Sequence, residues 1–199
     1  MNYTMLAFAG LDDIGMYLIE ENKEHFSLVQ AKKFEMRSRH LIPYVPDYLV
    51  NTEETVADLQ KFFKNNMEKA KRKMNYRVIL PDDFTEIESQ AMEDIMLQAG
   101  AKNCISEYTS FLLSKEKKYI AMTRSKRSVI VSKVDLDIAD SDEYFLDIHT
   151  VKEADIQAVL HTLDPNNQLP VYYYDMIEEL KVGTEVRRED IIDNFLTQI

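Results

Sequence analysis

Apolar residues recur with two different periods along the chain, and these periods separate expected strands from expected helices. Alternating or continuous apolar segments bounded by turn residues predict strands, whereas apolar residues at helical spacing predict amphipathic helices. In the first half the expected strands are residues 3–11, 15–21, 25–36, 76–81 and the beginning of 103–114. The expected helices are 51–73 and 85–99, and two prolines predict a loop over 37–50.

The helix expected over 85–99 has clear signals at both ends. Thr85 and Glu88 have the spacing of a capping box, in which each side chain binds the other residue's backbone N–H. Gly100 stands where a helix commonly ends in a left-handed residue. The apolar stripe between these ends is expected to consist of Ile87, Ala91, Ile95 and Ala99.

The second half repeats this alternation in a shorter form. Its expected strands are residues 117–125, 128–138, 143–150 and 169–175, and its expected helices are 152–163 and 188–199. In the terminal helix, which is expected to begin near Glu189, apolar residues fall on one face. We expect this helix to dock on its own half and to bury Phe195.

The order strand-strand-strand-helix-strand-helix-strand is that of a ribonuclease-H-like domain, and residues 50–107 resemble the bacterial actin MreB in more detail. The resemblance rests on a buried strand followed by Pro81, Thr85-Glu86, Ala91-x-x-Asp94 and residues 99–102, Ala-Gly-Ala-Lys. It implies an α/β protein of two small ribonuclease-H-like (actin-like) halves, with mixed sheets flanked by helices. The chain is too short for inserted subdomains, and the expected halves are 1–114 and 115–199.

Actin-like ATPases bind nucleotide through three loops, and the resemblance implies where these loops would lie in this chain. The sequence differs from the family's motif at each of the three positions. Ala9 stands near the expected aspartate of the first phosphate loop, and residues 121–129 lack the acid and glycines of the second. Residues 147–155 replace the glycine-rich adenosine loop, and of the family's Glu-Pro only Glu107 remains. The sequence therefore predicts no nucleotide, no metal, no other cofactor and no enzymatic activity.

Composition supports this expectation and narrows the choice of partner. Only four glycines occur in 199 residues, which disfavours a glycine-rich phosphate cradle. A net charge of −11 opposes binding to nucleic acid, and no apolar segment is long enough to insert into a membrane. The single cysteine, Cys104, suits a reducing compartment, and no signal peptide is evident, so a cytoplasmic location is expected.

Three polar or aromatic segments allow a functional and a structural interpretation. Residues 124–127, Arg-Ser-Lys-Arg, are expected to form a solvated hairpin tip and not an anion site. Residues 135–143 are expected to form a strand and an acidic turn, because they lack the glycine of a calcium loop. In the strand near the C-terminus, Tyr172 and Tyr174 should share one face and Tyr173 the other, which favours packing over recognition.

The leading hypothesis is a non-catalytic actin-like protein that binds a protein partner of unknown identity as a scaffold or regulator. Bacterial cytoskeletal or membrane-associated machinery would be a suitable setting, by likeness of fold alone. One alternative is a divergent actin-like ATPase or kinase that uses Asp12, Asp13 and Glu107 as its acids. The other is a filament former that needs no nucleotide, since self-association is compatible with the sequence.

Overall fold

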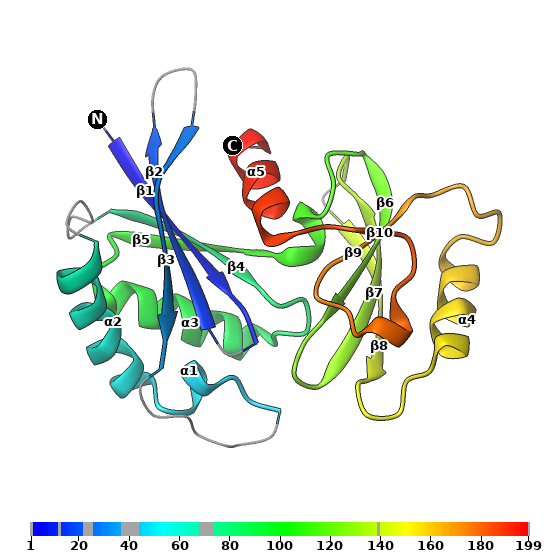
Figure 1. The fold of residues 1–199 in the computed structure, drawn as a ribbon, viewed down its shortest axis with the longest axis horizontal. Helices are drawn as coiled ribbons and strands as arrows, with labels where there is room; N and C mark the ends of the chain where they lie inside the picture. The colour runs from blue at the N-terminus through cyan, green and yellow to red at the C-terminus, as the bar shows by residue number, and fades with distance from the viewer. Residues whose placement is uncertain are drawn as a thin grey trace. The chain divides into compact units, whose positions relative to one another are not determined.

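The computed structural model describes residues 2–11, 13–21, 26–36, 44–67, 74–138 and 140–198, which form two compact units (Figure 1). The first unit comprises Met1–Leu80 and Phe84–Glu107, and the second comprises Pro81–Asp83 and Tyr108–Ile199. The short segment Pro81–Asp83 therefore belongs to the second unit, although the residues on both sides of it belong to the first. Sequence alone places the division at 114, whereas this grouping assigns 108–114 to the second unit.

The first unit is built on a five-stranded mixed sheet in the order β3-β2-β1-β4-β5. Its strands are β1 (Asn2–Ala9), β2 (Asp13–Glu21), β3 (Phe26–Glu35), β4 (Asn75–Leu80) and β5 (Asn103–Tyr108). β1, β2 and β3 form an antiparallel meander, and β4 runs parallel to β1. Every residue of β1 from Thr4 to Ala9 is buried, which explains its continuous apolar sequence, since a central strand is covered on both faces.

Three helices accompany this sheet: α1 (Asp47–Val50), α2 (Thr52–Asn66) and α3 (Glu86–Ala99). The capping box of α3 is confirmed, because Glu88 N–H donates to Thr85 Oγ1 at 3.3 Å and Thr85 N–H donates to the Glu88 carboxylate at 2.8 Å. Gly100 ends the helix with a φ of 128°, a backbone conformation that side chains rarely allow. α1 was not expected, since it lies inside the predicted loop.

The expected apolar stripe of α3 is only partly right. Ile95 and Ala99 are buried, but Ile87 is 81% exposed. A spacing of four residues advances the position around a helix by roughly 40° beyond a full turn, so the three steps from Ile87 to Ala99 add up to roughly 120°, and Ile87 lies outside the buried face. The buried face instead follows the i, i+3, i+4, i+7 pattern: Met92, Ile95, Met96 and Ala99.

The second unit repeats the sheet of the first. Its strands are β6 (Lys118–Arg124), β7 (Ser128–Asp135), β8 (Asp140–Asp147), β9 (Val171–Tyr173) and β10 (Thr184–Glu185). β6, β7 and β8 form an antiparallel meander, and β9 pairs in parallel with β6. Read from the meander outward, the order β8-β7-β6-β9-β10 corresponds strand by strand to β3-β2-β1-β4-β5. The predicted α/β fold of two halves with mixed sheets is thus confirmed.

One face of the second sheet is covered by α4 (Glu153–Leu163), whose Ile156 and Val159 lie in a cluster with Val129 and Val131 of β7. Tyr173 belongs to the same cluster, while Tyr172 and Tyr174 are only partly buried. The burial of Tyr173 between two less buried tyrosines agrees with the predicted alternation, although Tyr174 lies just beyond the end of β9. Between β9 and β10 the second unit has the short 3₁₀ turn η2 (Glu178–Leu180), where the first unit has the full helix α3 between β4 and β5.

The C-terminal helix α5 (Arg188–Gln198) belongs to the second unit and buries Phe195, as predicted, but it docks in part on residues 109–112, which the predicted division at 114 places in the first half. Its side chains Ile191, Ile192 and Phe195 are almost completely buried. The helix contacts the 3₁₀ turn η1 (Thr109–Leu112), and Asn194 Nδ2 donates to the backbone oxygen of Leu112 at 2.9 Å. The helix begins one residue before the expected position.

A buried carboxylate joins three separate segments of the second unit. Asp82 is 5% exposed; its Oδ1 accepts from Ser110 N–H at 2.8 Å, and its Oδ2 accepts from the Thr123 hydroxyl at 2.5 Å. These bonds connect Pro81–Asp83 to η1 and to β6. Burial raises the pKa of Asp82 to about 6, even though the bonds from Thr123 and Ser110 favour the ionised form.

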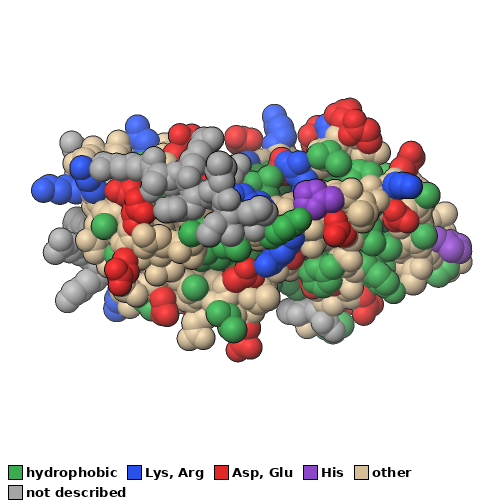
Figure 2. Space-filling model, turned by 90° about the horizontal axis from the view of Figure 1, so that it is seen from below, with side chains coloured by type: hydrophobic (Ala, Val, Ile, Leu, Met, Phe, Trp, Pro, Cys, Tyr) green, Lys and Arg blue, Asp and Glu red, His purple; other side chains and the backbone are tan. Residues whose placement is uncertain are grey.

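The surface of the molecule is mixed in character. Figure 2 shows acidic, basic and apolar side chains interspersed over the part of one face that the structure describes. Apolar side chains exposed on the second unit include Ile138 and Phe145. None of the helices in the described part of the chain combines the length and the apolar character that crossing a membrane requires.

The docking of α5 predicts a large effect of removing the ring of Phe195. Because this side chain is 1% exposed, Phe195→Ala should lower the free energy of unfolding by about 3 kcal/mol, through lost apolar contacts and a residual cavity. Urea denaturation followed by circular dichroism measures the change. Thr197→Ala, at an exposed position of the same helix, serves as the control. An unchanged midpoint for Phe195→Ala would contradict internal docking of the helix.

Asp82 predicts a pH dependence with a defined sign. Its pKa is raised in the folded protein, so its contribution to stability is complete below about pH 4 and is lost as the pH rises through about 6. Asp82→Asn lacks this ionisation. The difference in unfolding free energy between variant and parent should therefore shift in favour of the variant by about 2 kcal/mol between pH 4 and pH 7.5. A difference in unfolding free energy that stays constant between pH 4 and pH 7.5 would refute the assignment.

Candidate functional site

The turn between β1 and β2 occupies the position of the first phosphate loop in the resemblance to actin-like ATPases. Gly10 N–H donates to the backbone oxygen of Asp13 at 2.8 Å, and Tyr48 Oη donates to the backbone oxygen of Gly10 at 3.1 Å. The carboxylate of Asp13 lies 3.8 Å from Lys33 Nζ and its side chain is 11% exposed. Asp12, the other acid predicted here, lies outside the described residues. This turn is thus closed by a backbone hydrogen bond of its own and is held by a second hydrogen bond from Tyr48.

Glu107, the last of the three predicted acids, lies in β5 and pairs with Arg77 of β4 at 3.3 Å. Burial raises the pKa of Glu107, and the Arg77 guanidinium lowers it in part. Asp13 and Glu107 thus each have a cation as a charged partner, Lys33 for the first and Arg77 for the second. Among the described residues, no group of three His, Cys, Asp or Glu side chains could hold a metal ion.

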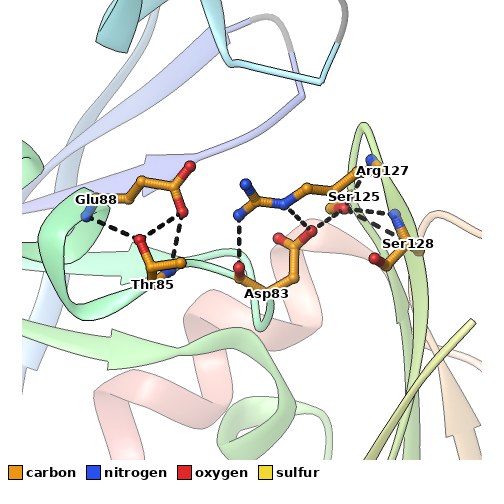
Figure 3. Close-up of polar contacts among 6 residues, drawn as sticks. All are labelled: Asp83, Thr85, Glu88, Ser125, Arg127 and Ser128. Atoms are coloured by element: carbon orange, nitrogen blue, oxygen red, sulfur yellow. Dashed lines mark hydrogen bonds and ion pairs between the residues drawn. The ribbon is translucent and has the colours of Figure 1, made fainter. Parts of the chain in front are cut away.

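The turn between β6 and β7 replaces the second phosphate loop, and a carboxylate from Pro81–Asp83 fills it (Figure 3). Arg127 Nε donates to Asp83 Oδ2 at 2.8 Å, and Arg127 Nη2 donates to the backbone oxygen of Asp83 at 2.5 Å. The Ser125 hydroxyl donates to the same carboxylate oxygen. Asp83 thus receives both a cation and a hydroxyl donor, and its side chain is only 5% exposed.

The prediction of a solvated hairpin tip over 124–127 is therefore wrong. Ser125 is 6% exposed, and the side chains of Arg124 and Arg127 are 23% and 29% exposed. Arg124 pairs with Asp175 at 3.2 Å, as Arg127 pairs with Asp83. Two acids distant in sequence thus pair with the two arginines of this turn, which the local sequence does not reveal.

Backbone donors of the same turn are also satisfied internally. The N–H groups of Arg127 and Ser128 both donate to Ser125 Oγ at 3.0 Å, and Ser125 N–H donates to the backbone oxygen of Ser128 at 2.9 Å. Phosphate-binding loops in proteins bind their ligand through such backbone donors. In this turn a serine side chain and a backbone oxygen already accept those hydrogen bonds.

The segment that replaces the adenosine loop is organised in a similar way. Asp147 Oδ1 accepts from His149 N–H at 2.8 Å, and the Asp147 backbone oxygen accepts from Val151 N–H at 2.9 Å. At the start of α4, the Asp155 carboxylate accepts from Lys152 N–H at 2.9 Å.

The acidic turn expected after β7 is present at residues 136–138, where Asp137 pairs with Lys117 at 2.9 Å.

Sequence analysis did not identify Asp82 or Asp83, although a usable signal was present. Two consecutive acids follow a buried strand directly after Pro81, and acids at the end of a parallel strand commonly belong to a site. The basic turn 124–127 was the complementary signal. Their pairing required the topology, because 44 residues separate Asp83 from Arg127.

No family model and no curated protein matches the sequence, whereas several solved structures share its fold at low identity. EutJ, an ethanolamine utilization protein from Carboxydothermus hydrogenoformans, matches with a TM-score of 0.57 and 10% identity over 87% of this chain and 76% of EutJ. MreB5 of Spiroplasma citri bound to ADP matches with a TM-score of 0.51 and 11% identity. That match covers 81% of this chain but only 57% of MreB5, so the chain spans little more than half of MreB5's length.

A third structure agrees in length as well as in fold. A Bacteroides thetaiotaomicron protein, described as having an actin-like ATPase fold and unknown function, matches with a TM-score of 0.50 and 8% identity. The match covers 98% of this chain and 96% of that one. Together with the repeated five-stranded sheets, these likenesses show that the chain has an actin-like ATPase superfamily fold.

Proposed function

We propose that this chain is a non-catalytic actin-like protein that acts in the cytoplasm by binding another protein, as a scaffold or regulator. The observation that carries the proposal is the occupation of the β6–β7 turn by Asp83, Ser125 and Arg127. A phosphate group would have to replace a carboxylate that already receives a guanidinium and a hydroxyl donor. It would also have to displace the serine oxygen that accepts the turn's backbone N–H groups.

Repulsion adds to this competition. A nucleotide phosphate placed at the turn would meet the negative charge of Asp83, and the guanidinium of Arg127 is already paired with that carboxylate. The two other expected loops offer no compensating glycine-rich backbone. A setting among bacterial cytoskeletal or membrane-associated machinery follows from likeness of fold and forms part of the proposal only as such.

A divergent ATPase or kinase is the second candidate, and one observation favours it. Burial raises the pKa of Glu107, as often occurs in catalytic acids and bases, and Asp13 is well shielded from solvent. MreB5 of Spiroplasma citri, which shares the fold, was solved bound to ADP. The pairing of Glu107 with Arg77 argues against this candidate, because the guanidinium stabilises the ionised carboxylate in a structural ion pair.

Calorimetric titration of the full chain with ATP and magnesium distinguishes the two candidates. The proposal predicts no binding tighter than a Kd of about 100 μM, which corresponds to about −5.5 kcal/mol. Binding below that value would reject the non-catalytic function. Asp13→Asn and Glu107→Gln would then be titrated in parallel, and loss of binding in either would identify the site of the ATPase candidate.

Sedimentation tests the nucleotide-independent filament former, the remaining alternative. The non-catalytic proposal predicts the same distribution of sedimenting species with and without ATP, because Asp83 already occupies the β6–β7 turn that would otherwise report nucleotide state. A pellet that forms equally under both conditions would favour the filament former. A pellet that depends on ATP would contradict both readings and support the ATPase.

A further inference from the structure

The outer edge of β8 has backbone hydrogen-bonding groups, among them those of Glu143 and Phe145, that no strand of the described residues binds. β8 is the last strand on its side of the second sheet, with β7 on its inner side, and no strand of the described residues pairs with its outer side (Figure 1). An unpaired edge presents a row of N–H and C=O groups that a further strand can bind. β8 is eight residues long, which is sufficient for such pairing.

The register of β8 identifies which backbone groups face outward. Just beyond the strand, Ile148 N–H donates to the Arg127 backbone oxygen at 3.0 Å, so the N–H of this residue points toward β7. Backbone direction alternates along an antiparallel strand. The N–H and C=O groups of Glu143 and Phe145, at odd positions, therefore point away from β7 and toward the outer edge.

Side chains on both faces of β8 are left uncovered next to these groups. Phe145 is 53% exposed and Tyr144 is 39% exposed, although their partners across the ladder, Ile130 and Val131, are fully buried. The apolar layers of the sheet thus extend over the inner strands and stop at β8. A sixth strand beside β8 would cover Phe145 on one face and Tyr144 on the other.

The charge of β8 determines which strand could bind there. Its sequence, Asp-Ser-Asp-Glu-Tyr-Phe-Leu-Asp, has four acidic residues and no basic residue. Pairing of two β8 strands from two copies would bring these acids together, so the edge disfavours self-association and selects a basic segment. We propose that β8 binds an extended basic segment of a partner protein by β-augmentation, with Lys or Arg opposite Asp142 and Glu143 and aliphatic residues opposite Tyr144 and Phe145.

This inference deepens the proposed protein-binding function and rests on it. It assigns the surface and the chemistry of the partner, neither of which depends on the β6–β7 turn. The ATP titration tests the absence of nucleotide binding, and the experiment below tests the surface. The ATP titration can contradict the non-catalytic function while the peptide experiment supports binding at β8, and the reverse is equally possible.

The test is a titration of the full chain with the acetylated, amidated hexapeptide Lys-Val-Val-Lys-Lys-Thr, monitored by amide NMR and hydrogen exchange. In an antiparallel pairing its two valines lie opposite Phe145 and Tyr144, and the two lysines that follow lie opposite Glu143 and Asp142. We expect slowed exchange of the N–H groups of Glu143 and Phe145 and little change at Tyr144, whose N–H already points to β7. The peptide with Glu in place of each Lys should not bind. A peptide that binds without protecting the amides of Glu143 and Phe145 would overturn the proposal, as would failure to bind.

Paired substitutions at one position separate the backbone from the charge. Glu143→Pro removes an outward N–H and should weaken binding by about tenfold or more, whereas Glu143→Gln keeps that donor and should weaken binding less. Because the removed N–H is not part of the β7–β8 ladder, Glu143→Pro should melt close to the parent protein. Asp142→Pro, which removes an inward N–H, should melt lower. Unchanged peptide affinity in folded Glu143→Pro would overturn the proposal.

Discussion

The buried carboxylate of Asp82 is the contact on which the arrangement of the second unit depends. Removing a carboxylate from water is costly unless hydrogen bonds compensate, and Asp82 receives one from η1 and one from β6. The chain leaves the first unit after Leu80 and returns to it at Phe84, so these two bonds hold a three-residue excursion inside the second unit. The raised pKa of Asp82 shows that compensation is incomplete at neutral pH.

Asp83 takes its position from the same excursion. Once Asp82 is fixed, the next side chain lies against the β6–β7 turn, where Ser125 and Arg127 bind it. A single serine hydroxyl then does two things, because it donates to Asp83 and accepts from two backbone N–H groups of the turn. The turn thereby obtains from its own chain the acceptors that a bound anion supplies in phosphate-binding loops.

Local signals in the sequence predicted much of the fold, because each expected element depends on neighbours within one or two turns. The cap of α3 at Thr85 and its end at Gly100 needed only residues within the helix. The repeated order of strands and the burial of Phe195 followed from periodicity. The predicted burial of Ile87 was wrong, because residues at a strict four-residue spacing move progressively around the helix.

Contacts between distant segments could not be predicted in this way. Arg127 looked like an exposed tip because its partner, Asp83, is supplied by a segment far away in sequence. The sequence did show that the glycines of the phosphate loops are absent, but not what fills their place. Composition can show that the glycines of a phosphate loop are missing. Which side chain takes the place of the phosphate depends on which strand ends the topology brings together.

A ligand stabilises a protein only while it is bound, and its effect depends on its concentration. An internal carboxylate stabilises the turn permanently, at the cost of burying charge. Under the proposed function the replacement of a bound phosphate by an internal carboxylate is favourable, since a scaffold gains from a single rigid state and needs no nucleotide cycle. The phosphate-loop turns of the two units are closed by hydrogen bonds at Gly10 and Ser125, whereas no strand of the described residues pairs with the outer edge of β8. Selection for binding would act on that edge and not on the turns.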